Sequence, residues 1–183
     1  MSFPAFFDTC VLYSGVLNDL LLRLAERGAF RPLWSSDVMA ELRKNLVRRF
    51  PEDAVDRRLA AMQRAFPDAM VDGYENLVSG MLCDPKDRHV LAAAVRANAE
   101  LLVTFNLRDF PSALTEAFDV EVVNPDDFLL DQLDLFPGLT LRALRDLVDD
   151  YSNPEISLEE LLQRLSRAGV PKFAQELNSR FME

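Results

Sequence analysis

Short apolar runs that alternate with longer helix-like segments constrain the fold of this chain more than any other feature. The runs contain three to five residues, whereas the segments between them repeat apolar residues every three or four positions. We predict strands at residues 4–7, 31–34, 69–71, 100–104 and 120–123. We predict helices between them at residues 12–28, 35–50, from 51 onward, 74–81 and 84–98. This order indicates an α/β domain with a mostly parallel central sheet flanked by helices.

After Pro125 the pattern becomes purely helical. We predict further helices at residues 126–136, 139–151, 158–168 and 172–181, separated by Pro, Gly and Asn residues that end helices. We therefore divide the chain into an α/β domain at residues 1–136 and a helical C-terminal extension at residues 137–183. A chain of 183 residues that is 49% hydrophobic can bury a core of this size.

The charge of the chain is unevenly distributed. The net charge of -10 argues against a nucleic-acid partner when it is taken as a sum. However, residues 1–110 carry 14 Lys and Arg against 15 Asp and Glu, whereas residues 111–183 carry 6 against 15. The first part is therefore nearly neutral, and one bound divalent cation would make it positive.

The chain contains no apolar run long enough to span a bilayer, and its first residues lack the basic charges of a signal peptide. We therefore expect a cytoplasmic protein without membrane contact. Its two cysteines, Cys10 and Cys83, lie in apolar surroundings, and we expect both to be reduced.

Four acidic residues lie where predicted strands end or helices begin: Asp8, Glu41, Asp87 and Asp109. Ligands of a parallel sheet bind beyond the carboxyl ends of its strands, so we expect these side chains to gather at one edge. Gathered carboxylates repel each other and imply a cation. Carboxylate oxygens suit Mg²⁺ or Mn²⁺, either of which can activate water for attack on a phosphodiester.

Helix capping is a competing explanation for most of these acids. Asp84, which a proline follows, is expected to cap the next helix, so that Asp87 would lie in its first turn and favour the helix dipole. Asp37 is expected to be a cap too, and it remains a minor metal candidate because it lies four residues before Glu41. Asp8 directly follows an apolar strand and has no such local explanation.

Four motifs resemble those of a known family. They read FFDTCVL at residues 6–12, SDVMAEL at 36–42, DPKDRHVLAAA at 84–94 and TFNLRDF at 104–110. In this order, and between these predicted elements, they resemble the PIN-domain nucleases and, within them, the VapC-type toxins of bacterial toxin–antitoxin pairs. The resemblance covers residues 4 to about 125 and implies a PIN-like fold there.

The resemblance implies a metal-dependent endoribonuclease that hydrolyses RNA phosphodiester bonds with Mg²⁺ or Mn²⁺. Carried over by position, the metal-binding and catalytic residues are Asp8, Glu41, Asp87 and Asp109. The resemblance also implies polar side chains that orient the carboxylates or water, and in this chain they are Thr9, Thr104 and Asn106. The family also implies an RNA substrate, an antitoxin that holds the toxin inactive, and homodimerisation.

The roles of other charged side chains near the motifs also need an interpretation. Arg88 and Arg108 flank the acids, and we expect them to hold RNA phosphate. Seven Lys and Arg residues between positions 43 and 64 form either the solvated surface of a helical hairpin or an RNA-backbone contact. We interpret His89, the only histidine, as structural, because metal-dependent hydrolysis does not require a histidine base.

Three other functions were weighed against a nuclease. A phosphatase of the haloacid-dehalogenase type needs a second Asp two positions after the first, where this chain has Cys10. A receiver domain needs an acidic pair after its first strand, where only Asp8 is present. The remaining alternative is a PIN fold without catalysis that serves as an RNA-binding or protein-docking module, which the intact acids disfavour.

Overall fold

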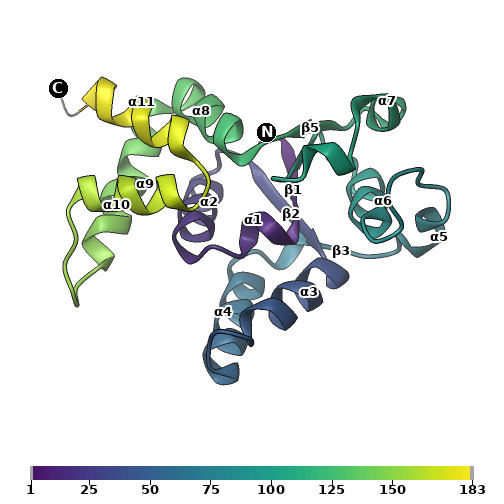
Figure 1. Cartoon of the computed structure of the whole chain (residues 1–183), viewed down its shortest axis with the longest axis horizontal. Coiled ribbons are helices and arrows are strands. Elements are labelled where there is room, and N and C mark those ends of the chain that lie inside the picture. The colour runs from purple at the N-terminus through teal and green to yellow at the C-terminus, as the bar shows by residue number, and fades with distance from the viewer. Residues whose placement is uncertain (1, 182–183) are drawn as a thin grey trace. The chain divides into compact units, whose positions relative to one another are not determined.

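The computed structural model describes residues 2–181, which form two compact units (Figure 1). The first unit comprises the residues up to Tyr13 together with Phe30–Val123. The second comprises Ser14–Ala29 together with the residues from Asn124 onward. Most of the segment between the first two strands, Ser14–Ala29, therefore belongs to the second unit. The predicted division between residues 136 and 137 stays a prediction.

A five-stranded parallel sheet forms the centre of the first unit. Its strands are β1 (Pro4–Phe7), β2 (Arg31–Ser35), β3 (Met70–Val71), β4 (Leu101–Val103) and β5 (Glu121–Val123), in the order β3-β2-β1-β4-β5. Each pair is parallel, which confirms the predicted α/β fold class. Phe7 is opposite Val103 in the register, so the residues that follow β1 and β4 emerge side by side.

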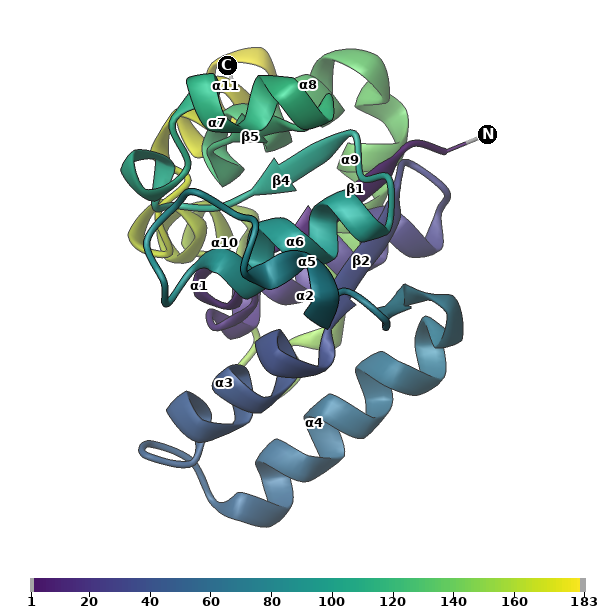
Figure 2. The same ribbon diagram turned by 90° about the vertical axis from the view of Figure 1, so that its right-hand side faces the viewer.

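The helices of the first unit are short, apart from three. They are α1 (Thr9–Leu12), α3 (Ser36–Leu46), α4 (Glu52–Ala65), α5 (Glu75–Val78), α6 (Arg88–Arg96) and α7 (Ser112–Thr115). Single 3₁₀ turns lie between these elements, at η1 (Pro67–Ala69), η2 (Leu107–Asp109) and η3 (Glu116–Phe118). Figure 2 shows α5 and α6 in front of the sheet, and α3 and α4 as a hairpin beside it.

Local sequence explains the two helices that carry the site. Helix α3 begins where the Ser35 hydroxyl accepts a hydrogen bond from the Val38 main-chain nitrogen at 3.2 Å. Its buried face carries Val38, Leu42 and Leu46 at the spacing of an amphipathic helix. Helix α6 is rich in alanine, and its buried small side chains allow a close approach to β2 and β4.

The predicted start of α6 is wrong by one turn. The Asp84 carboxylate accepts a hydrogen bond from the main-chain nitrogen of Lys86 at 3.1 Å, which closes a turn instead of opening a helix. The helix begins at Arg88, so Asp87 is its N-cap residue rather than a member of its first turn, and the Asp87 side chain makes no capping hydrogen bond. Capping therefore does not explain Asp87.

The second unit consists of five helices among the described residues. They are α2 (Gly15–Glu26), α8 (Pro125–Leu135), α9 (Pro137–Asp150), α10 (Leu158–Arg167) and α11 (Pro171–Phe181). Helix α2 packs against α9 and α10, and ion pairs join Arg23 to Asp150 and Arg27 to Asp146. Asp126, which is buried, caps α11 by accepting hydrogen bonds from two of its first main-chain nitrogens at 3.0 and 2.8 Å.

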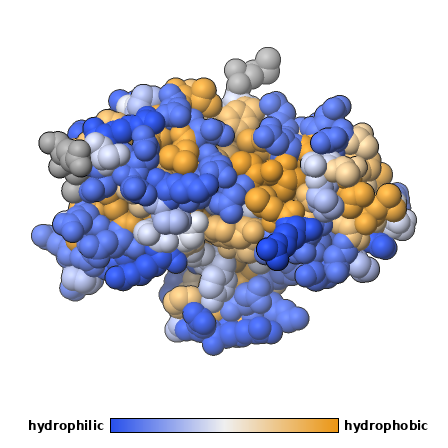
Figure 3. Space-filling model, turned by 45° about the horizontal axis from the view of Figure 1, so that its top comes forward, coloured by the Kyte–Doolittle hydropathy of each residue, from blue (hydrophilic) through white to orange (hydrophobic). Residues whose placement is uncertain are grey.

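The face drawn in Figure 3 carries hydrophilic regions and hydrophobic patches side by side. Among residues 2–181, no helix combines the length and the apolar character needed to cross a bilayer. Both cysteines are free thiols, as predicted.

Candidate active site

Asp8 lies at the carboxyl end of β1, where the sheet itself fixes its position. Its main-chain nitrogen donates to the Val103 carbonyl oxygen at 3.1 Å and so extends the β1–β4 ladder by one residue. Thr104 follows β4 at the same level and is fully buried. The residues that follow these two strands therefore lie side by side at one edge of the sheet.

The Asp8 carboxylate is 7% exposed and held by three donors. Its Oδ1 accepts a hydrogen bond from the Thr9 main-chain nitrogen at 2.7 Å. Its Oδ2 accepts from the Thr104 hydroxyl at 2.7 Å and from the Cys10 thiol at 3.4 Å. The Thr104 hydroxyl in turn accepts from the Asn106 main-chain nitrogen at 3.0 Å. These bonds fix the orientation of a buried carboxylate that still has free lone pairs.

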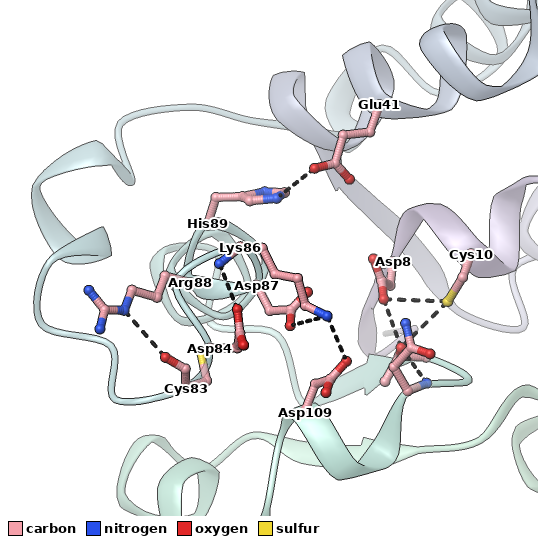
Figure 4. Close-up of polar contacts among 12 residues, drawn as sticks. Asp8, Cys10, Glu41, Cys83, Asp84, Lys86, Asp87, Arg88, His89 and Asp109 are labelled. Carbon is pink, nitrogen blue, oxygen red and sulfur yellow. Dashed lines mark hydrogen bonds and ion pairs between the residues drawn. The ribbon is translucent and has the colours of Figure 1, made fainter.

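A second chain of hydrogen bonds connects α1, α3 and α6. The Thr9 hydroxyl donates to Glu41 Oε2 at 2.9 Å. Glu41 Oε1 lies 3.1 Å from His89 Nε2 (Figure 4). Thr9 therefore contacts Asp8 through its main chain and Glu41 through its side chain. His89 positions Glu41 in this arrangement, which agrees with its interpretation as a structural residue.

Asp87 and Asp109 are connected by a lysine rather than by direct contact. Lys86 Nζ lies 3.8 Å from Asp87 Oδ2 and 3.8 Å from Asp109 Oδ2. The lysine side chain is largely exposed, and Figure 4 shows it between the two carboxylates. The nearby carboxylates raise the pKa of Lys86, with Asp87 as the largest cause and Asp109 as the next. A cation is thus already attracted to this pair.

Burial is the largest cause that raises the pKa of Asp87 above its usual value. Lys86 opposes that effect, whereas the carboxylates of Asp109, Asp8 and Asp84 add to it. Asp87 Oδ2 is buried and accepts no hydrogen bond from any residue that the structure describes. Lys86, at 3.8 Å, therefore compensates the charge of Asp87 only in part.

Burial also raises the pKa of the Cys10 thiol to about 11, and the neighbouring Asp8 carboxylate is the next cause. At neutral pH the thiol is therefore protonated and can donate to Asp8. The sequence did not predict this role, because the neighbours of Cys10 in the sequence indicate only an apolar environment.

A cavity of about 540 Å³ brings the site residues together. Its lining includes five predicted residues: Asp8, Thr9, Glu41, Asp87 and Asn106. Its lining also includes Cys10, Tyr13 and Asn45, which were not predicted to belong to the site. Arg48 and Arg49 complete the lining, and both belong to the basic run for which an RNA contact was one of two alternatives. A second cavity of about 510 Å³ lies beside β5 and contains none of the predicted site residues. The first cavity is therefore the candidate active site.

The remaining predicted residues lie around that cavity. Asp109 lies in η2, and its Oδ2 is connected to the site by Lys86, whose Nζ lies 3.8 Å away. Arg88 donates from Nε to the Cys83 carbonyl oxygen at 3.3 Å and points away from Asp8 (Figure 4). Arg108 is exposed in η2, and a phosphate-binding role for both arginines stays a prediction. Asp37 accepts a hydrogen bond from the Tyr74 hydroxyl at 2.8 Å and does not line the cavity.

The residues present fit a divalent cation. The donor set consists of carboxylate oxygens, as Mg²⁺ and Mn²⁺ prefer. The buried Asp87 oxygen without a hydrogen bond and the lysine ammonium between two carboxylates both indicate a place for positive charge. Across residues 2–181, however, no three His, Cys, Asp or Glu side chains are grouped closely enough to hold a metal ion. Metal binding thus requires side-chain rotation, for which Asp109 and Glu41 have room because they are partly exposed.

The fold and the motifs define the class of this protein. A family model described as PIN domain matches residues 4–108, which is more than half of the chain. The chain therefore belongs to the PIN-domain family, and the predicted PIN-like fold is confirmed.

The resemblance to the VapC type is supported by two further comparisons. A family model described as VapC50 C-terminal domain matches residues 125–179. The chain is 42% identical over 113 residues to a curated protein named "Putative ribonuclease VapC50" from Mycobacterium tuberculosis (strain ATCC 25618 / H37Rv). The match spans 62% of this chain and 66% of that protein, just under two thirds of its length. No solved structure matches the chain.

Proposed function

We propose that this protein is a metal-dependent endoribonuclease that hydrolyses RNA phosphodiester bonds, and the toxin of a toxin–antitoxin pair. The observation that carries the proposal is the shared cavity of Asp8, Glu41 and Asp87, at the carboxyl edge of a PIN-type sheet. The name of the mycobacterial relative, which includes the words ribonuclease and VapC50, supports the same activity. The alternative of a PIN fold without catalysis is disfavoured, because such a module has no need of buried, repelling carboxylates.

In the proposed mechanism, Asp8, Glu41, Asp87 and Asp109 would hold Mg²⁺ or Mn²⁺, directly or through water. The cation would supply an activated water and would neutralise charge on the phosphodiester under attack. Thr104 and the Thr9 main-chain nitrogen keep the Asp8 carboxylate in one orientation through their hydrogen bonds of 2.7 Å. The Thr9 hydroxyl orients Glu41 at 2.9 Å.

Cleavage of RNA by the purified full-length chain tests the proposal. We expect cleavage with Mg²⁺ or Mn²⁺ and none in EDTA. Asp8→Asn and Asp87→Asn are expected to abolish cleavage while circular dichroism stays unchanged. Asp37→Asn is the matched control, because this carboxylate belongs to the same unit but lies outside the cavity, and it should cleave like the parent. Parent-like cleavage by Asp8→Asn would show that the proposed site is wrong.

We further propose a cytoplasmic protein that binds an antitoxin and forms a homodimer. The support is the VapC-type resemblance together with the matched C-terminal domain. Purification from the native host should yield a small partner whose removal releases the ribonuclease activity. Light scattering of the separated chain should give twice the monomer mass of 20.8 kDa. A host preparation that is active without any partner would contradict the antitoxin, and a monomer mass would contradict the dimer.

A further inference from the structure

The seven cations of the α3–α4 hairpin are not equivalent. Arg43 and Arg57 form ion pairs with carboxylates of α4. Arg58 donates hydrogen bonds to main-chain oxygens at the end of α1, at distances down to 2.6 Å. The side chains of Arg48 and Arg49, in contrast, have no partner among the residues that the structure describes, and both line the cavity of the candidate active site. The structure thus separates cations that stabilise the hairpin from cations that face the site.

Helix periodicity explains why these two arginines face the cavity. Glu41, Asn45, Arg48 and Arg49 follow each other at intervals of four, three and one, and the turn after α3 continues through main-chain bonds of 3.0 Å. All four line the cavity, whereas the opposite face of α3 is buried. One face of the segment therefore carries a carboxylate at its start and two guanidinium groups at its end.

We propose that Arg48 and Arg49 form a subsite for an RNA backbone phosphate that adjoins the phosphodiester under attack. A guanidinium group presents forked donors that match phosphate oxygens, and an arginine without a carboxylate partner keeps these donors available. The acidic part of the cavity attracts a cation and repels phosphate, so a bound strand needs a separate anchor. This inference rests on the proposed ribonuclease function and assigns the part of the cavity that holds the strand.

A helix-capping role is the competing explanation. Cations in the last turn of a helix interact favourably with its dipole. That role would lower the thermal stability of the variants and leave RNA affinity unchanged. A phosphate subsite instead lowers RNA affinity, and it does so with a characteristic dependence on salt, because each neutralised phosphate of a single strand contributes about 0.7 to the slope of log affinity against log salt.

The test measures binding of a fluorescein-labelled single-stranded RNA of mixed sequence by anisotropy, between about 50 and about 200 mM KCl. All proteins carry Asp87→Asn, so that RNA is not cut, and each is checked by a thermal melt. The double variant Arg48→Gln/Arg49→Gln should lower the slope by about 1.4, which corresponds to about tenfold weaker binding near 0.15 M salt. Each single variant should lower it by about 0.7.

Two controls match these variants. Arg64→Gln removes a hairpin arginine that has no ion-pair partner among the described residues but does not line the cavity, and it should keep the parent slope. Arg48→Lys/Arg49→Lys keeps both charges and should retain most of the slope. An Arg64→Gln variant that weakens binding as much as the double variant would overturn the inference, because general surface charge would then suffice.

The remaining outcomes separate this inference from the proposed activity. A double Gln variant with the slope of its parent would overturn the subsite even if the wild-type chain cuts RNA. Loss of binding to the antitoxin with unchanged RNA affinity would also overturn it, since the arginines would then serve a protein partner. Arginine-dependent RNA binding by a wild-type chain that never cuts RNA would support the subsite and contradict the ribonuclease.

Discussion

Asp8 and Asp87 line the same cavity, yet the structure predicts opposite effects on stability when each is neutralised in the metal-free protein. Asp8 accepts two hydrogen bonds of 2.7 Å, from the Thr9 main-chain nitrogen and the Thr104 hydroxyl. Asp8→Asn keeps the shape but removes the charge. Since a hydrogen bond to a charged group contributes about 1 kcal/mol more than a neutral one, the loss is about 2 kcal/mol. For a chain of this size that lowers the melting temperature by about 4–8 °C.

Asp87→Asn should raise the stability of the metal-free protein instead. Asp87 Oδ2 is buried without a hydrogen-bond partner, and burial is the main cause that raises the pKa of this carboxyl. A raised pKa means that the folded state retains a proton that the unfolded state has lost, so stability decreases as pH rises through that interval. Neutralising Asp87 removes this cost at neutral pH, whereas below both pKa values the parent and the variant should converge.

Urea unfolding of the parent and the two variants in EDTA, followed by circular dichroism at neutral and acidic pH, measures both effects. A simple repulsive cluster would give stabilisation by both substitutions, because each removes one negative charge. The structure predicts stabilisation by Asp87→Asn only. Asp8→Asn with higher stability than the parent would refute the reasoning that its hydrogen bonds outweigh repulsion.

Four further outcomes are expected. Thr104→Val removes the donor to Asp8 and should cost about 1–3 kcal/mol in unfolding free energy and lower the cleavage rate; unchanged values would show that the hydroxyl is dispensable. The parent should lose about 2.7 kcal/mol of stability as pH rises from 9 to about 11, because the folded state retains the Cys10 proton, and Cys10→Ala should lack this loss in alkaline urea titrations. Mn²⁺ at about 100 times its dissociation constant should stabilise the parent by about 2.7 kcal/mol but should stabilise Asp87→Asn less, as thermal melts would report. Lys86→Met should tighten Mn²⁺ binding in calorimetry, because its ammonium group lies 3.8 Å from two carboxylates and must leave; weaker binding would contradict this competition.

The sheet was predictable because each strand is a short apolar run between polar residues. All five predicted strands are present, with ends shifted by at most one residue. The start of α6 was not predictable, because an Asp followed by a proline fits either a helix cap or a turn. Here the Asp84 carboxylate bonds to the second residue after it, and the helix begins only at Arg88. Local sequence does not determine which of these two bonding patterns forms.

The candidate site was predictable only in part. Asp8 could be identified because an acid directly after a buried strand is unusual, and its pairing with Thr104 follows from the sheet register. The expectation that Asp8 has no local explanation was wrong, because its carboxylate also caps the short helix α1 through the Thr9 main-chain nitrogen. Cys10 and Lys86 were missed as site residues, and Arg48 stayed undecided between a solvated surface and an RNA contact, because their roles depend on distances between elements that are far apart in the sequence. By residue type alone, Cys10 would fit an apolar core, Lys86 a solvated surface and Arg48 the end of a helix.

The course of the chain through α2 bears on how this protein is made. Helix α2 comes early in the chain, after β1 and the short α1, but its buried leucines pack against α9 and α10, which follow more than 100 residues later. During synthesis, an apolar helix therefore leaves the ribosome long before its partners and remains uncovered until α9 and α10 have been made. A premature stop before residue 137 would release a chain with that surface exposed, which quality-control proteases recognise. For a chain proposed to destroy RNA, we therefore expect incomplete copies to be degraded rather than left as active fragments.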